Sequence, residues 1–224
     1  MSNTNYQENP QLQDFPDFDH VFDRFKNTGN LKSENQIRAY KAISKHWSVG
    51  KAVLDAGCGI GIGSNILSWD AIGVWGVDNN AQNISVARQL FERPTVKFEV
   101  VDLVQGPERP VATFDVVVAI EIIEHIKEYD NFLQQLKRFY EPKRRTVFFI
   151  SSPNRNNPEL SKDKPKNEHH VREWTAGEFY DVLTKRFGAV VLYDMNKVDN
   201  FTKDETVDGD TEVTPILAKV ENPL

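Results

Sequence analysis

The stretch from Ala52 to Asp78 constrains the fold more than any other part of the chain. It begins with the apolar segment Ala52–Ala56, continues through glycines at alternate positions, and closes with a second apolar segment that ends at Asp78. Apolar runs with β-branched residues are typical of buried strands, and the residues between these two runs fit a helix. Parallel strands joined by a crossover helix belong to an open α/β sheet. The stretch therefore predicts a β–turn–α–β unit within a mostly parallel sheet.

The spacing of the glycines indicates the kind of ligand. The loop carries Gly57, Gly59 and Gly61. Glycines let a backbone turn sharply and let a ligand approach it closely. A dinucleotide fingerprint would need glycine or alanine where the chain has Ile62 or Ser64, so the pattern disfavours a nicotinamide cofactor. Asp78 stands where this fold brings a carboxylate to the ribose hydroxyls of a nucleotide-like ligand.

Size and composition exclude several classes of protein. The 224 residues, 39% of them hydrophobic, suit one sizeable α/β domain. A net charge of −6 argues against broad electrostatic binding to nucleic acid or anionic membranes. The single cysteine, Cys58, excludes a disulfide framework and a cysteine metal cluster. No run approaches the roughly 20 apolar residues of a membrane span, and the N-terminus lacks a signal pattern, so we expect a cytoplasmic protein.

The remaining sequence continues the α/β pattern. Further apolar segments predict strands at residues 96–101, 114–120, 146–151, 189–193 and 215–220. Helical spacing predicts helices over residues 80–91, 132–139 and 174–187. Asn80 and Thr175 are the expected N-caps, and Gly188 is the expected end of the last helix. The acidic, polar residues 203–212 predict an exposed loop.

Two motifs resemble those of a known family. Asp55-x-Gly57-x-Gly59-x-Gly61, followed by Asp78, resembles motif I of the class I S-adenosylmethionine (SAM)-dependent methyltransferases. The segment Phe114–Ile120, with Asp115 near its start, resembles motif IV. The resemblance extends from about residue 51 to the C-terminus. It implies a Rossmann-like sheet flanked by helices, mostly parallel with the last strand antiparallel, and SAM as the cofactor.

The resemblance also implies which residues contact the cofactor. In that family the glycine loop passes under the methionine part, the acid after the second strand holds the ribose, and the acid after the third strand bonds the adenine. The residues so implied are Asp55, Gly57, Cys58, Gly59, Gly61, Asp78, Asn79, Asp102, Leu103 and Glu121. Two alternatives stay open: Asp102 caps a turn, and Cys58 is simply small enough to let the backbone pass.

The N-terminal region carries two further predicted helices. Residues 1–13 are polar and predict a flexible lead. Apolar residues recur at helical spacing over residues 14–25 and 37–47. These helices either pack on the sheet or form a lid over cofactor and substrate. We expect the lead and lid helices within residues 1–47 and the methyltransferase domain within residues 48–224.

Two groups of titratable residues follow predicted strand ends, Glu121–His125 and Glu168–Thr175. Methyl transfer from a sulfonium is an in-line displacement that needs alignment, and a base when the acceptor is a hydroxyl. Histidine titrates near neutrality, so His125 and His170 are the catalytic candidates, together with Glu124; His169 is a further possible base. The E-x-x-E-H pattern resembles a segment of ubiquinone-biosynthesis-like O-methyltransferases. We therefore expect transfer to an oxygen of a small molecule.

A weaker similarity suggests an alternative. E-x-x-E-H together with a histidine ahead of E-W-T-x-x-E-F resembles the small-RNA 3′-terminal 2′-O-methyltransferases, in which such residues hold a divalent metal. The ligands so implied are Glu121, Glu124, His125 and His170, with Mg²⁺ or Mn²⁺ as the ion. The alternative function is metal-dependent methylation of an RNA ribose, which the acidic net charge disfavours. A non-catalytic SAM-binding protein is the second alternative. If no metal is bound, we expect Glu124 and His125 to hydrogen-bond the backbone at the start of the helix, and His170 to close the pocket as a substrate contact or base.

Overall fold

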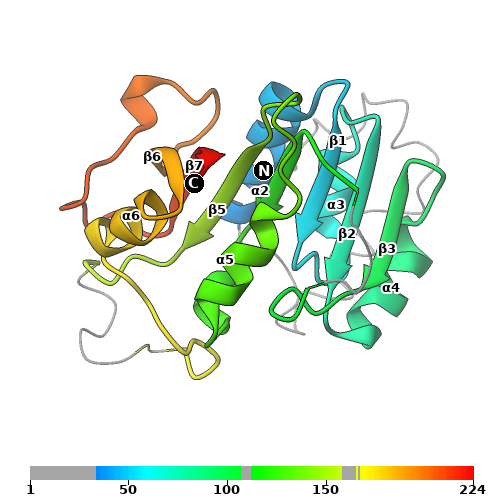
Figure 1. Cartoon of the computed structure of the whole chain (residues 1–224), viewed down its shortest axis with the longest axis horizontal. Helices are drawn as coiled ribbons and strands as arrows, with labels where there is room; N and C mark the ends of the chain where they lie inside the picture. Colours follow the sequence, from blue (N-terminus) through cyan, green and yellow to red (C-terminus); the bar gives the residue numbers. More distant parts are fainter. Residues whose placement is uncertain (1–33, 107–111, 158–164, 166) are drawn as a thin grey trace, which may run out of the picture.

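The computed structural model describes residues 34–106, 112–157, 165 and 167–224. Its centre is a seven-stranded sheet in the order β3-β2-β1-β4-β5-β7-β6 (Figure 1). The strands are β1 (Ala52–Ala56), β2 (Gly73–Asp78), β3 (Val96–Val100), β4 (Val116–Ala119), β5 (Val147–Ser152), β6 (Phe187–Asp194) and β7 (Ile216–Pro223). β7 is antiparallel to both β5 and β6, whereas the other pairings are parallel. The predicted fold class is confirmed.

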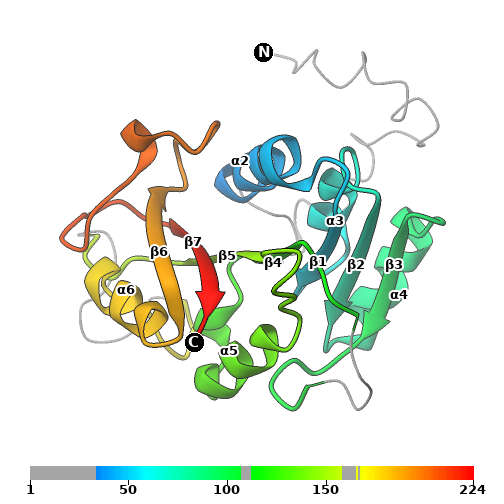
Figure 2. The same ribbon diagram turned by 45° about the horizontal axis from the view of Figure 1, so that its top comes forward.

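Helices cover both faces of the sheet (Figure 2). They are α2 (Glu34–Ile43), which continues as the π-helix η3 (Ser44–Ser48), then α3 (Ile62–Leu67), α4 (Ala81–Phe91), α5 (Tyr129–Lys137) and α6 (Ala176–Thr184). Two short 3₁₀-helices are η4 (Ile123–His125) and η5 (Lys203–Glu205). Apolar residues of α2, α3 and α4 share one hydrophobic core, and those of α5 and α6 share the other. None of the described helices is long and apolar enough to cross a bilayer.

The strand sequences explain this layering. Val53 of β1 belongs to the first core, whereas Leu54 and Ala56 belong to the second, because successive side chains point to opposite faces. Every residue of β4 is buried. Such a continuous apolar strand is typical of the centre of a parallel sheet with helices on both sides.

Local capping signals agree with most of the helix boundaries. The Asn80 side chain accepts hydrogen bonds from the first turn of α4, and Thr175 forms a capping box with Glu178 at α6. The predicted helix end at Gly188 is wrong, because α6 ends at Thr184 and Gly188 lies within β6. Phe187 is buried against Phe148, and the β6 residues pair with β7. Pairing with a distant strand therefore overrides the local helical pattern.

The N-terminal predictions are only partly covered. The lead and the helix expected over residues 14–25 lie outside the described residues. Tyr40 and Ile43 of α2 are fully buried in the first core. This helix therefore packs on the face of the sheet, while the division at residue 47 stays a prediction.

Candidate active site

The glycine loop follows β1 at the carboxyl edge of the sheet. Gly57 and Gly59 have φ of +75° and +56°, a left-handed conformation that favours glycine. A Cβ at Gly57 would collide with the side chain of Ile122, so packing requires glycine there. A Cβ at Gly59 would meet no atom within 4 Å in the described part of the chain. The loop is thus closed beneath Gly57 and accessible beside Gly59.

Asp78 joins this loop to the start of α4. Its Oδ2 accepts the Gly59 N–H at 2.9 Å, and its Oδ1 accepts the Asn80 N–H at 2.8 Å. The side chain is half-buried, and the neighbouring Asn79 is exposed. Carboxylate oxygens have more than one lone pair each, so Asp78 keeps capacity to accept further hydrogen bonds.

Asp55 is fully buried beneath the loop. Its carboxylate accepts hydrogen bonds from the Tyr40 hydroxyl at 2.9 Å and from the Ser64 hydroxyl at 2.7 Å. Burial, followed by the charge of Asp55, raises the pKa of Tyr40 well above its ordinary value, so the phenol stays protonated as the donor. Asp55 therefore connects α2, β1 and α3. Its predicted contact with the cofactor stays a prediction.

The residues after β3 adopt a turn. Asp102 is exposed, and its Oδ1 accepts the Val104 N–H at 2.8 Å. Leu103 is buried in the second core. The turn-capping alternative thus describes one interaction of Asp102, and the expected adenine contacts stay predictions. Cys58 is also buried.

Glu121 at the end of β4 has a strained backbone, with φ of +54°. Its N–H donates to the Ser151 hydroxyl at 2.7 Å, and this hydroxyl donates to the Glu121 Oε1 at 2.7 Å. A left-handed conformation costs a non-glycine residue about 1–2 kcal/mol. Such strain concentrates at functional sites, where the surrounding structure maintains it.

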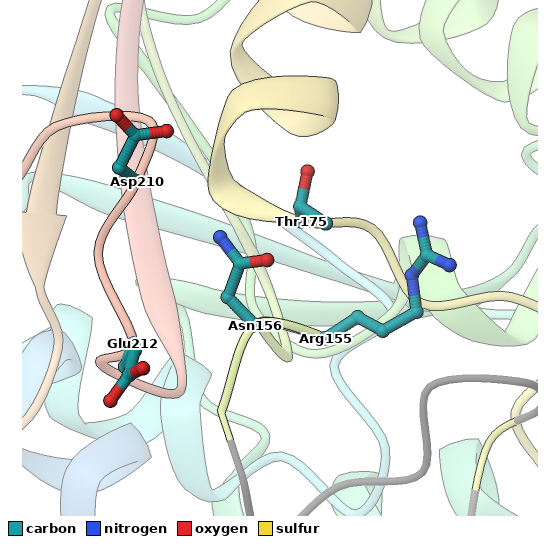
Figure 3. Close-up of a pocket in the computed structure, with 5 residues that line it drawn as sticks. All are labelled: Arg155, Asn156, Thr175, Asp210 and Glu212. Atoms are coloured by element: carbon teal, nitrogen blue, oxygen red, sulfur yellow. The ribbon is translucent and has the colours of Figure 1, made fainter.

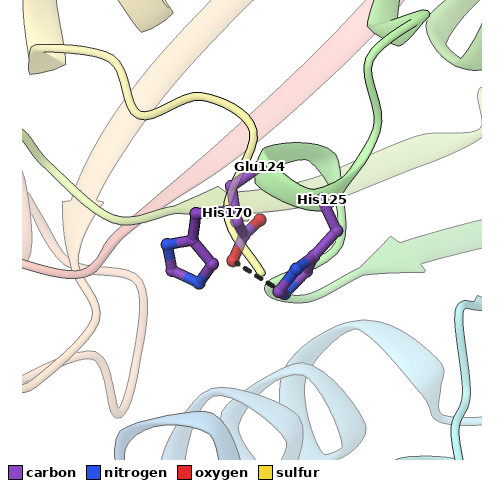
Figure 4. A group of neighbouring side chains, drawn as sticks. All are labelled: Glu124, His125 and His170. Atoms are coloured by element: carbon purple, nitrogen blue, oxygen red, sulfur yellow. Dashed lines mark ion pairs between the residues drawn. The ribbon is translucent and has the colours of Figure 1, made fainter. Parts of the chain in front are cut away.

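Glu124, on η4, is a buried carboxylate with unsatisfied oxygens. Its side chain has 0% exposure, and neither Oε1 nor Oε2 has a hydrogen-bond partner among the described residues. Burial raises the pKa of Glu124 well above its ordinary value, and the nearby charges of Glu121 and Glu173 raise it further. The Glu124 carboxylate lies beside the imidazoles of His125 and His170, whose ring centres are 4.7 Å apart (Figure 4).

The tautomer of His125 follows from its backbone contact. Its Nδ1 lies 2.9 Å from the His169 carbonyl oxygen, which can only accept, so Nδ1 carries the proton. Nε2 is then an acceptor, 3.9 Å from Glu124 Oε1. Burial lowers the pKa of His125, and the neighbouring imidazoles of His170 and His169 add to this effect. The ring therefore favours its neutral form.

His170 is held at both ring nitrogens. Its Nδ1 lies 2.7 Å from Glu173 Oε1, and its Nε2 lies 2.9 Å from Asn167 Nδ2. The amide nitrogen is a donor, so Nε2 accepts and Nδ1 donates to the carboxylate. Sequence reasoning did not identify Asn167 or Glu173 as partners, although both are three residues from His170.

The structure brings together three of the four predicted metal ligands. Ligand atoms of Glu124, His125 and His170 all lie within 4.8 Å of one another. Glu121 is outside this group, although its charge affects Glu124. His125 bonds a backbone carbonyl, whereas the Glu124 carboxylate has no hydrogen-bond partner among the residues described, so the alternative without metal stays a prediction.

A polar cavity lies beyond the end of β5 (Figure 3). It has a volume of about 390 Å³ and is lined by Arg155, Asn156, Thr175, Asp210 and Glu212. The adjacent Asn154 is fully buried and donates to the carbonyls of Thr211 and Val213 at 2.7 and 2.8 Å. Asn154 thereby fixes the loop that carries Asp210 and Glu212 to the carboxyl edge of the sheet.

Curated relatives match the central part of the chain. A probable S-adenosylmethionine-dependent methyltransferase from Mycolicibacterium smegmatis is 33% identical over 138 residues, which are 62% of this chain and 52% of that protein. A ubiquinone biosynthesis O-methyltransferase from Pseudomonas paraeruginosa is 30% identical over 137 residues, or 60% of this chain and 58% of that protein. The chain thus spans about half the length of the curated relatives it matches.

Solved structures share the fold. The N-methyltransferase NodS from Bradyrhizobium japonicum, in complex with S-adenosyl-L-homocysteine, has a TM-score of 0.58 at 17% identity, covering 98% of each chain. The methyltransferase domain of bacterial CtHen1 has a TM-score of 0.61 at 22% identity, covering 84% of this chain and 97% of the other. At these identities the likeness supports the fold alone.

Sheet order, glycine loop and relatives together define a class I SAM-dependent methyltransferase. The sequence profile of a family described as a methyltransferase domain matches residues 32–204, and the chain belongs to this family.

Proposed function

We propose that this methyltransferase moves the methyl group of SAM to a hydroxyl oxygen of a small molecule, at the Glu124–His125–His170 cluster. One observation carries the proposal: beyond the end of β4, the fully buried Glu124 carboxylate has no hydrogen-bond partner in the described part of the chain and lies beside two imidazoles. A buried charge without partners is costly, so a protein retains one mainly where a ligand or a reaction needs it. A hydroxyl acceptor needs a base, and the ring nitrogen of an imidazole can supply it.

The cofactor side of the proposal rests on the glycine loop. SAM supplies an activated methyl group on a sulfonium, which needs alignment more than chemical assistance. The accessible side of Gly59 suits a backbone approach to the cofactor, and Asp78 has acceptor capacity for ribose hydroxyls. We assign Asn79, Asp102 and Leu103 to the nucleoside.

The remaining contacts of the predicted set are assigned by position. Gly57, Cys58 and Gly61 form the backbone of the loop, and Glu121 borders the methionine end. Asp55 supports the loop from below through its bonds to Tyr40 and Ser64.

His170 is the base that the geometry favours. Glu173 holds its Nδ1–H at 2.7 Å, so that Nε2 points away from the Glu173 carboxylate. Nε2 accepts a hydrogen bond from the side-chain amide of Asn167 at 2.9 Å. Asn167 is exposed, so the hydroxyl of an acceptor can displace its amide from Nε2. His125 orients the acceptor through Nε2, because its Nδ1–H is held by the His169 carbonyl.

The same cluster fits a divalent metal ion. It offers one carboxylate and two imidazoles, and the unsatisfied oxygens of Glu124 would gain a partner. Mixed nitrogen and oxygen ligands suit Mn²⁺ or another first-row ion better than Mg²⁺, which prefers oxygen. When bound, such an ion would polarise the acceptor oxygen and lower its pKa. Contacts of His170 with Glu173 and of His125 with His169 would orient the two imidazoles toward it.

This fit also favours a second candidate, metal-dependent methylation of a ribose 2′-hydroxyl in RNA. The net charge of −6 weighs against it, because RNA binding relies on contacts with phosphates.

The deciding experiment uses methyl-labelled SAM and a whole-cell extract separated into small-molecule, RNA and protein fractions. The protein is first treated with chelator, then assayed with and without added Mn²⁺. Label in small molecules supports the main proposal, and restoration by Mn²⁺ supports the metal site. Label in RNA favours the second candidate, whereas label in protein alone contradicts both. Glu168→Gln is a matched control for Glu124→Gln, because the Glu168 side chain is 88% exposed.

A further inference from the structure

We propose that Arg172 binds a phosphate group of the acceptor, so that the substrate is a phosphorylated small molecule. The inference rests on the proposed function and deepens it. Arg172 lies two residues beyond His170, and its backbone N–H donates to the Glu124 carbonyl at 3.3 Å. The residue is therefore fixed to the cluster through the main chain.

Aromatic stacking holds the Arg172 guanidinium while leaving its N–H groups available. The guanidinium carbon lies 4.7 Å from the centre of the Tyr129 ring and 5.7 Å from the Trp174 ring. Stacked guanidinium groups still present their in-plane donors to a carboxylate or phosphate. Arg172 has no carboxylate partner among the described residues, whereas Arg155 is paired with Glu178 and Arg186 with Asp130.

Arg172 lines a cavity next to the cluster. This cavity has a volume of about 470 Å³, and Glu173 and Trp174 also line it. Glu173 is the residue whose Oε1 contacts His170 Nδ1 at 2.7 Å. Glu173 thus contacts the proposed base and also lines the cavity.

Charged side chains of both signs line the cavity. The cations are Arg155, Arg172 and Lys185, and the carboxylates are Glu173, Glu178 and Asp181. Arg155 is paired with Glu178, and Glu173 accepts a hydrogen bond from His170. The guanidinium fork of Arg172 matches phosphate oxygens in a bidentate manner, and Lys185 is a second cation in the same lining.

The test begins with inorganic phosphate as the probe and needs no methyl transfer. Protein labelled with ¹⁵N-arginine is titrated with phosphate, and the Nε–H signal of Arg172 is assigned by its loss in Arg172→Lys. We expect a saturable shift of this signal, and at least about tenfold weaker phosphate binding in Arg172→Ala. Arg138→Ala is the control, because Arg138 is exposed and bonded to Gln135. SAM affinity verifies that each variant is folded.

An unshifted Arg172 signal, or equal phosphate binding by Arg172→Ala and wild type, overturns the proposal. The methyl-labelled small-molecule product is then treated with a phosphatase. A change in its charge supports a phosphorylated acceptor, and a phosphatase-resistant product contradicts it. Failure of the proposed function would appear separately, as absence of any labelled small molecule, because the phosphate titration is independent of catalysis.

Discussion

Asp55 and Glu124 are both fully buried carboxylates at the carboxyl edge of the sheet, but their surroundings differ. Asp55 accepts hydrogen bonds from Tyr40 and Ser64, two residues that are themselves buried. Glu124 has no hydrogen-bond partner among the described residues and is surrounded by titratable groups. A satisfied buried carboxylate serves the framework, whereas an unsatisfied one marks the place where an external partner is needed.

The difference between the two carboxylates predicts that Glu124 matters for activity rather than for folding. Glu124→Gln keeps the shape of the side chain but removes its ionisable carboxyl group, so methyl transfer should fall by about 10²–10⁴-fold. Its free energy of unfolding should equal or exceed that of wild type, because the variant buries no carboxylate. Labelled-SAM assays and urea denaturation measure both quantities beside the Glu168→Gln control. A clear loss of stability would show that Glu124, like Asp55, supports the folded structure, and would remove the difference between the two carboxylates.

Asp55 should show the opposite behaviour. Asp55→Ala removes the buried acceptor that the hydroxyls of Tyr40 and Ser64 share, which should lower the free energy of unfolding by about 2–4 kcal/mol. Urea denaturation at pH 7 tests this, with Asp102→Ala as an exposed control. A stability change within about 0.5 kcal/mol would show that Asp55 is not a framework residue.

Glu173 tests whether the contacts around the cluster position His170. Glu173→Gln keeps a side chain able to accept the His170 Nδ1–H but removes its charge. We expect kcat to fall by about 10-fold while SAM affinity is unchanged. Equal reductions in activity and SAM affinity would instead indicate a general loss of structure.

The smallest expected effect concerns pH dependence at the Arg155–Glu178 pair. Burial alone would raise the pKa of Glu178, but hydrogen bonds from Arg155 and Thr175 outweigh it and hold the pKa below its ordinary value. The pair therefore stabilises the fold above the unfolded pKa and loses this contribution as the pH falls through the folded pKa.

Because the Glu178 side chain is 51% exposed, we expect Glu178→Gln to lose only about 0.2–1 kcal/mol at pH 7. The difference from wild type should shrink as the pH falls below the ordinary glutamate pKa of about 4.3, and vanish below the lowered pKa of the folded state. Thermal denaturation over this pH range measures it, and a constant difference would mean that the ion pair is not its source.

Local signals predicted the fold more completely than the site. Asn80 and Thr175 could be recognised as caps because their partners lie within three residues, and alternating or continuous apolar runs located the strands. Gly188 was misjudged because the partner strand β7 lies more than 25 residues further along the chain.

The site was predictable only in outline. Strand ends brought His125 and His170 together as expected, because the carboxyl ends of parallel strands share one edge. The contact between Glu121 and Ser151 joins different strands, and the missing partners of Glu124 depend on everything packed around it. Neither property is present in a short stretch of sequence.

The order of the strands also has a consequence for synthesis on the ribosome. β7 follows β6 in the chain but lies between β5 and β6 in the sheet. Strands β1 to β5 can pair in the order in which they are translated, whereas β6 can bridge only residues 206 and 207 of the described chain before the residues of β7 have emerged. The ladder that joins β6 to the sheet therefore forms late, and the half of the sheet next to the proposed acceptor site is completed last.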